Sequence, residues 1–120
     1  MSENFYLSGA ALCSANNTYI LIDYQVNSQQ KVKIYNLSID LNPVTYFSDI
    51  FFTLYINNKA QPYFSSINSQ ITQSYYPLTL QNPIIVEPSW KIIWQITCLS
   101  SLGSNTVNAF ASLQGTIEAV

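Results

Sequence analysis

Apolar and polar residues alternate with a period of two along most of this chain, which is the pattern of β-strands that bury one face. β-Branched and aromatic residues fill the alternating segments, and Asn, Ser, Gln and Pro separate them. Eight segments fit the pattern: residues 18–26, 31–41, 50–56, 60–64, 77–80, 83–86, 90–98 and 106–119. The sequence therefore predicts an all-β protein with about eight strands.

Two features of this pattern predict local geometry. The alternation changes phase once within the second segment, so we expect a β-bulge between Tyr35 and Asn36. The pair Asn57 and Asn58 tolerates positive φ, and it predicts a hairpin whose return strand runs to Phe64.

The chain reads as one domain, residues 1–120, because no repeat, linker or charge block interrupts it. Residues 1–17 have an alternative interpretation as an extended N-terminal arm. Residues 65–76 show no stable period before Pro77, and we expect the longest exposed loop there.

About eight strands joined by turns suit a single-domain antiparallel sandwich of two sheets, and we expect a jelly-roll-like fold. An immunoglobulin-like sandwich is the alternative. Its usual order of Cys, Trp and Cys is missing, because both tryptophans lie shortly before Cys98 and far beyond the second and third strands.

Trp90 and Trp94 share one face of a strand with Ile92, Ile96 and Cys98. At about 3.3 Å per residue the two indoles are roughly 13 Å apart, a spacing that would let them contact separate residues of an oligosaccharide. This face is too continuously apolar to remain wet in a soluble monomer. We therefore expect the tryptophans to pack mainly in the core, with Trp90 near a strand end.

The polar residues are unusual because only 8% of the chain is charged, against about a quarter in typical domains. Ser, Thr, Asn and Gln supply 44 of the 120 residues. A net charge of −2 without Arg or His leaves no basic cluster for nucleic acid. The commonest general base and metal ligand, His, is also missing. We expect no nucleic-acid partner, no cofactor and no metal site.

The carboxylates and thiols offer little chemistry. Asp23, Asp40 and Asp49 would have to converge to form a glycosidase pair, and their strand-like or turn-like contexts give no sign of it. Cys13 and Cys98 are too few for a zinc site, and they are either disulfide-bonded or buried as free thiols. We therefore predict that the chain is not an enzyme.

The residues from 1 to 17 have no basic start and only a short apolar run, so we expect neither a signal peptide nor a membrane span. Tyr63, Tyr75 and Tyr76, together with Trp90, are the contact candidates, since Tyr on a polar loop offers rigid contact area at little entropic cost. Ordinary packing against the sandwich is the other interpretation. If these aromatics bind a ligand, the chain is a carbohydrate-binding or receptor-binding module for a cell-surface glycan.

The segments LYINNKAQPYF, PLTLQNPIIVEPSWKIIWQIT and NTVNAFASLQGTIE resemble small jelly-roll proteins of virus particles: capsid, vertex or decoration subunits. The likeness covers the last two-thirds of the chain and lies in a strand, an Asn turn, a P-I-x-V-x-P corner and a final alternating strand. In many such domains a Gly follows the corner Pro, and here Ser89 stands there. The resemblance implies a non-catalytic virion protein made in the host cytoplasm, working as a homo-oligomer or with other coat proteins.

Few charges are available to protect exposed strand edges from pairing with other chains. Lys31, Lys33 and Lys59 could guard edges near two turns, whereas the late strands hold only Lys91. We therefore expect a neighbouring subunit to cover the edges of the late strands.

Overall fold

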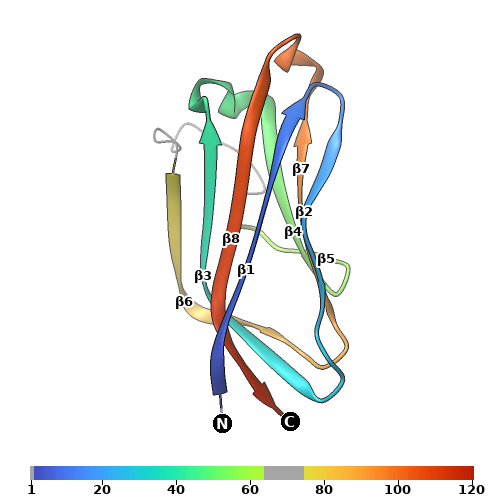
Figure 1. Cartoon of the computed structure of the whole chain (residues 1–120), viewed down its shortest axis with the longest axis vertical. Helices are drawn as coiled ribbons and strands as arrows, with labels where there is room; N and C mark the ends of the chain where they lie inside the picture. Colours follow the sequence, from blue (N-terminus) through green and yellow to red (C-terminus); the bar gives the residue numbers. More distant parts are fainter. Residues whose placement is uncertain (1, 64–74) are drawn as a thin grey trace.

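The computed structural model describes residues 2–63 and 75–120, which form two four-stranded antiparallel sheets (Figure 1). Sheet A has the strand order β1-β8-β3-β6, and sheet B has the order β2-β7-β4-β5. The strands are β1 (Ser2–Ser14), β2 (Thr18–Gln25), β3 (Gln30–Asn42), β4 (Ile50–Ile56), β5 (Lys59–Ala60), β6 (Tyr75–Val86), β7 (Lys91–Cys98) and β8 (Thr106–Ala119). The predicted two-sheet, all-β sandwich is confirmed.

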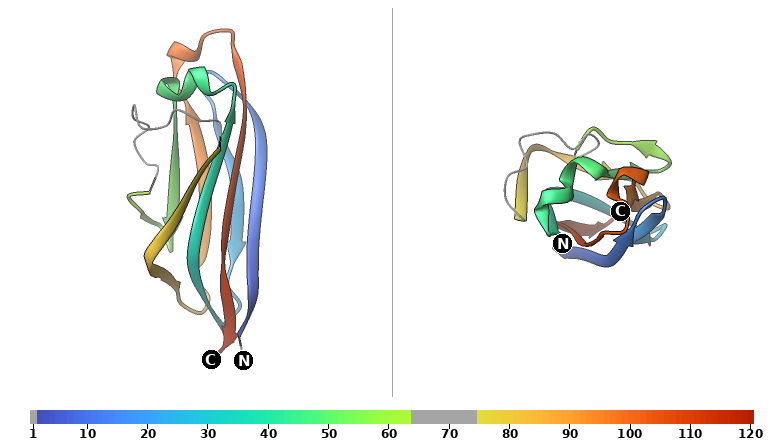
Figure 2. Two further views of the ribbon diagram at one scale, coloured as in Figure 1. Left: turned by 90° about the vertical axis from the view of Figure 1, so that its left-hand side faces the viewer. Right: turned by 90° about the horizontal axis from the view of Figure 1, so that it is seen from above.

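The strand pairing is that of a jelly roll. β1 pairs with β8, β2 with β7, β3 with β6 and β4 with β5, so the chain forms one long antiparallel hairpin rolled into two layers. The pairs β3 with β8 and β4 with β7 then join the arms of the hairpin within each sheet. Figure 2 shows the two layers, with both termini at one end. This order differs from that of an immunoglobulin sandwich.

Two short 3-10 helices, η1 (Val44–Asp49) and η2 (Ser100–Leu102), lie at the end of the sandwich opposite the termini (Figure 1). η1 leads from sheet A into sheet B, and η2 leads back from β7 to β8. The backbone N–H of Leu99 donates to the Asp49 carbonyl at 2.8 Å, and the Ser101 hydroxyl donates to the Asp49 carboxylate at 2.6 Å. These bonds tie the two crossovers together. In the described ranges, no helix is long and apolar enough to cross a membrane.

The core lies between the inner faces of the sheets. β4 buries every second residue, as the alternation predicts: Ile50, Phe52, Leu54 and Ile56. β8 faces it with small and medium side chains: Val107, Ala109, Ala111 and Leu113. Trp94 is fully buried and packs edge-on against Phe52, with 6.4 Å between ring centroids. Trp90 precedes β7 and is half-buried against the same core. Core packing is therefore the main role of the tryptophans, as expected.

The β-bulge predicted in sheet A is present. Against β8 the register of β3 shifts between Ile34 and Asn36, which leaves Tyr35 as the extra residue. Against β6 the pairing breaks at the same place, and there residues 80–83 of β6 are left unpaired. Gly115 of β8 lies beside this bulge, and a Cβ there would overlap the carbonyl oxygen of Lys33. The bend in β3 is therefore possible only because residue 115 has no side chain.

Sheet B contains a second bulge, and it also faces a glycine. The register of β2 shifts between Ile20 and Ile22. The carbonyl oxygen of Leu21 then points at Gly9 of β1, in the other sheet, so closely that a Cβ on Gly9 would overlap it. The missing side chain of Gly9 therefore lets the backbones of β1 and β2 come into contact between the two sheets.

The turn between β4 and β5 is formed by Asn57 and Asn58, with φ of 51° and 68°, as the Asn pair predicts. The return strand β5 contains only two residues, so it is shorter than the expected run to Phe64. Phe64 itself and the rest of residues 64–74 lie outside the described residues. Tyr75 and Tyr76, expected in that loop, begin β6 instead.

Three expectations about strand boundaries and edges need correction. The segments PLTL and PIIV form one strand, β6, with Pro77 and Pro83 inside it. This is tolerated because β6 is at the edge of sheet A, where an N–H can be missing. β7 and β8 lie inside the sheets, so strands of the same chain already cover their edges. Residues 2–14 form β1, the strand at the other edge of sheet A.

Candidate interaction surfaces

The four contact candidates do not form one platform. Tyr63 and Trp90 line the same cleft, which lies between the β4–β5 hairpin and the second half of β6. Tyr75 is half exposed on the outer face of sheet A, beside a shallow hollow lined also by Pro77. Tyr76, one residue later, pairs with Ile39 and packs against the core. The structure therefore brings together Tyr63 and Trp90 and separates the other two.

The cleft of Tyr63 and Trp90 has a volume of about 480 Å³ and mixes aromatic, aliphatic and amide side chains. Three amide side chains line it: Asn57, Gln61 and Asn82. One charged residue, Lys59, completes its rim. Neutral hydrogen-bonding groups beside aromatic rings are suited to an uncharged polar ligand.

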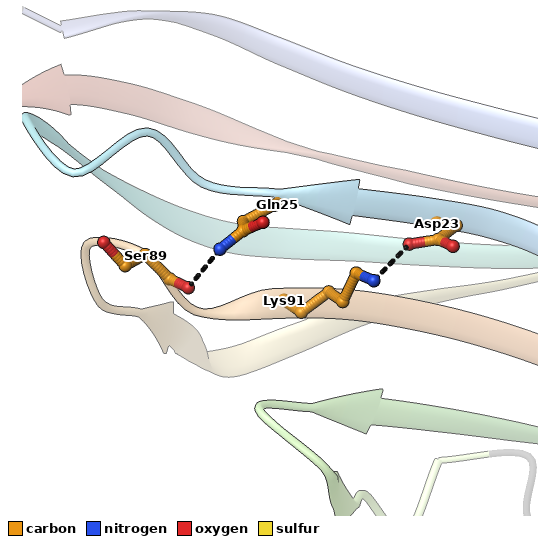
Figure 3. Close-up of polar contacts among 4 residues, drawn as sticks. All are labelled: Asp23, Gln25, Ser89 and Lys91. Atoms are coloured by element: carbon orange, nitrogen blue, oxygen red, sulfur yellow. Dashed lines mark hydrogen bonds and ion pairs between the residues drawn. The ribbon is translucent and has the colours of Figure 1, made fainter.

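Trp90 is held at the cleft by the corner that precedes β7. The backbone N–H of Trp90 donates to the Glu87 carbonyl at 3.1 Å, which closes a four-residue turn with Pro88 second and Ser89 third. Ser89 has φ of 69°, the value that a type II turn requires at its third position. The side chain of Gln25 donates to the Ser89 carbonyl at 3.1 Å, as Figure 3 shows.

The outer face of sheet A carries a second surface, which we call the A face. Four of its side chains are large, apolar in their bodies and exposed: Tyr6, Leu12, Tyr35 and Tyr75. Small residues lie between them, including Ser38 and Ser112, whose buried hydroxyls share a hydrogen bond across β3 and β8. Two hollows lie on either side of Ser38 and Ser112 along the strands. The hollow beside Leu12 has a volume of about 390 Å³, and the one beside Tyr6 and Tyr35 has a volume of about 470 Å³. Exposed apolar ridges beside hollows are typical of a protein-binding surface.

Sequence reasoning did not find Tyr6, Leu12 and Tyr35. In the segment SENFYLSGAALCS both phases of the alternation contain apolar residues, so no strand face stands out. The inner phase holds Phe5 and Cys13, which are buried, and the outer phase holds Tyr6 and Leu12. The signal available in this segment was that apolar residues occupy both faces of one strand, because one of those faces must then be covered by something outside the core.

The charged groups are scattered over both sheets. Lys33 and Glu118 approach to 3.8 Å on sheet A, and Lys91 and Asp23 to 3.5 Å on sheet B (Figure 3). All four side chains are a third to a half exposed, so each pair contributes little to stability. Asp40 is on the outer face of sheet A, so it and Asp23 lie on opposite layers of the sandwich. Asp23 and Asp40 therefore do not form a pair, and the Asp49 carboxylate accepts a hydrogen bond from Ser101.

Both cysteines are buried, free thiols. Burial raises the pKa of Cys13 to about 12, and the neighbouring Cys98 adds to the rise through its charge and a hydrogen bond. Burial also raises the pKa of Cys98, while its hydrogen bond with Cys13 opposes that rise. Near neutral pH both groups are protonated thiols inside the core, where they act as small apolar side chains.

No protein-family model matches the chain, and no curated protein matches it. Solved structures do match. A chain of the acidic stable capsid structure of Helicobacter pylori bacteriophage KHP30 superimposes with a TM-score of 0.54 and 13% identity, covering 100% of this chain and 98% of that one. Aeromonas hydrophila PliG, a periplasmic inhibitor of g-type lysozyme, is also similar, with a TM-score of 0.40, 13% identity, and coverage of 98% and 88%. The first likeness shows a shared fold over the whole chain.

Proposed function

We propose that this protein is a non-catalytic structural subunit of a virus particle, located in the virion and acting through contacts with other coat proteins and with copies of itself. The observation that carries the proposal is the overlap with the phage capsid chain, which covers 100% of this chain and 98% of that one. A capsid subunit needs a rigid fold and adhesive surfaces, and the jelly roll with its A face supplies both.

The surface chemistry supports the same function. Many copies packed side by side would repel one another if each had a high net charge, and this chain has a net charge of −2 with 8% charged residues. Asp23 and Asp40 lie on different sheets, and both thiols are protonated near neutral pH, which supports a non-catalytic function.

The test is whether the chain is a stoichiometric part of particles. Antibodies raised against the purified protein are used to probe density-gradient fractions of virus from the organism that encodes it. We expect the chain to co-sediment with intact particles at a fixed ratio to the major coat protein. Its absence from washed particles would overturn the proposal, as would turnover of a small-molecule substrate by the purified chain.

A second function is favoured by the cleft of Tyr63 and Trp90: binding of a neutral oligosaccharide, such as a cell-surface glycan. Aromatic rings stack on sugar faces, and amide side chains bond sugar hydroxyls in both directions. Trp90→Ala and Tyr63→Ala should each abolish signals on a glycan array, whereas Tyr75→Ala, outside the cleft, should not. If Tyr75→Ala alone removes the signal, the cleft is not the site.

A further inference from the structure

The part of the chain that the structure describes has four edge strands, and three of them are protected. β5 contains two residues, and one of them is Lys59. β6 contains Pro77 and Pro83, and its pairing with β3 is interrupted between Thr79 and Ile84. β2 has eight residues, with a bulge at Leu21. Short length, Lys, Pro and bulges are the devices that keep an edge from pairing with another chain.

The fourth edge, β1, has none of these devices. It pairs with β8 over 13 successive residues, from Ser2 to Ser14, without a shift in register. It contains no Pro and no Lys, and its single charge is Glu3, near one end. In both Figures 1 and 2 no described strand runs along the outer side of β1 within sheet A. At the end of this edge the backbone N–H of Ser14 donates to the Tyr19 hydroxyl at 3.1 Å, and the Ser14 carbonyl accepts from the Asn17 side chain at 3.5 Å. Before Ser14, a long, regular edge of this kind presents a row of backbone N–H and C=O groups suited to another strand.

We propose that β1 is the assembly edge of this protein, and that its partner is β1 of a second copy, paired antiparallel about a two-fold axis at Ser8. The two sheets A then form one continuous eight-stranded sheet. Ser8 is the middle residue of the strand, so this register alone pairs all 13 residues. The inference rests on the proposed function and deepens it, because it names the contact through which subunits associate.

The side chains of β1 are self-complementary in this register. Antiparallel pairing about Ser8 sets three large residues opposite small ones: Tyr6 opposite Ala10, Leu7 opposite Gly9, and Phe5 opposite Ala11. The fourth, Leu12, lies opposite Asn4. Even-numbered residues meet even-numbered residues, so the exposed outer sides of both copies stay on one face. Large side chains beside small ones pack without collision.

The charges allow the same register. In the pairing about Ser8, Glu3 of one copy lies opposite Cys13 of the other, so the two carboxylates are at opposite ends of the ribbon. Lys33 and Glu118, the ion pair of sheet A, lie on β3 and β8 and not on the edge itself. No like charges meet across the axis, so the second copy encounters no electrostatic barrier.

The first experiment compares two lysine variants by sedimentation equilibrium. Ser8→Lys sets two ammonium groups directly opposite each other across the axis, and Ser28→Lys adds the same charge in the exposed β2–β3 turn. We expect the full-length wild type and Ser28→Lys to dimerise alike, and the dissociation constant of Ser8→Lys to rise about tenfold or more. A wild-type chain that remains monomeric at millimolar concentration, or equal dimerisation of both variants, overturns the proposal.

The second experiment tests the register by oxidative cross-linking. Ser8→Cys should form a disulfide-linked dimer, and an equimolar mixture of Tyr6→Cys and Ala10→Cys should give a mixed dimer faster than either alone. Ser28→Cys is the control, and the native thiols stay reduced because they are buried. Cross-linking of Ser28→Cys as fast as Ser8→Cys overturns the register.

The outcomes separate the two proposals. If the chain is present in particles but Ser8→Lys associates normally, the proposed function stands and the β1 contact is wrong. If β1 dimers form but no particle contains the chain, the contact stands and the virion function is wrong.

Discussion

Ser89 adopts a backbone conformation that favours glycine. It holds the third position of the corner turn with φ of 69°, where a side chain crowds the backbone and Gly does not. The Gln25 side chain bonds to its carbonyl group and not to its hydroxyl, so the Ser89 side chain makes no bond in that contact. Glycine would preserve this bond and remove the crowding.

We predict that Ser89→Gly raises the free energy of unfolding by about 0.5–1 kcal/mol, because relief of the strained φ outweighs the added flexibility of the unfolded chain. Ser89→Val should lower it by about 1 kcal/mol or more, since a β-branched side chain is least compatible with positive φ. Urea unfolding measures both. If Gly is destabilising, the turn does not carry the strain assigned to it.

The buried thiol of Cys13 predicts that the free energy of unfolding falls at alkaline pH. Its pKa is about 12 in the folded protein and has an ordinary value of 9.0, so the unfolded chain releases this proton first. Stability is therefore complete below pH 9 and is lost as pH rises toward 12, by up to about 1.4 kcal/mol per pH unit for one proton.

Cys13→Ala should flatten the fall in stability between pH 9 and 11 in urea unfolding at fixed ionic strength. Val107→Ala is the matched control, because Val107 is the buried partner of Cys13 on β8 and carries no titratable group. The control should lower stability by the same amount at every pH. Equal alkaline slopes in wild type and Cys13→Ala would contradict the prediction.

At the scale of the elements, each bulge depends on a glycine in a different strand. Gly115→Ala would push a Cβ into the Lys33 carbonyl group. Because the Lys33 carbonyl is a backbone group, the overlap can be relieved only by a shift of β3 or β8. We predict a loss of about 3 kcal/mol or more in the free energy of unfolding, at the upper end for overpacking. Gly103→Ala is the control, because its φ is 66° and no atom lies within 4 Å of the added Cβ. That control should cost about 1 kcal/mol.

The alternation predicted the elements whose faces differ in polarity. β4 and β8 each bury one phase and expose the other, and the bulge at Tyr35 followed from a change of phase. No strand was predicted before residue 18, where an extended arm was the alternative, because both phases of β1 contain apolar residues. The isolated glycines within strand patterns, Gly9 and Gly115, were a usable sign of close backbone approach.

Edges and contact sites were harder to predict, because they depend on which strands become neighbours. The sequence indicates that β7 and β8 are strands but not that they lie inside their sheets, so their need for a neighbour's cover was predicted wrongly. Tyr63 and Trp90 meet because β5 and the corner turn are packed against one cleft, although 26 residues separate them in sequence. Pairing of this kind follows from topology and not from local pattern.

For the whole molecule, the composition predicts stability that hardly depends on pH in the acidic to neutral range. The chain has six carboxylates and no His, and the ion pairs of Lys33 and Lys91 are partly exposed. Few protons are therefore exchanged on unfolding. We expect the melting temperature to vary by only about 5 °C between pH 4 and 8 in differential scanning calorimetry, since a change of about 1 kcal/mol shifts it that much. A steep change would indicate a carboxylate whose role this structure does not explain.

The position of β8 has a consequence for synthesis. β8 lies between β1 and β3, so β1 gains a neighbour in its own sheet only after the ribosome has made β8, which comes much later in the sequence. Until then Phe5, Leu7 and Cys13 have no completed core to enter. β1 therefore stays unpaired in sheet A until β8 has been made, and during that time a chaperone, or β1 of another unfinished copy, can reach its backbone groups.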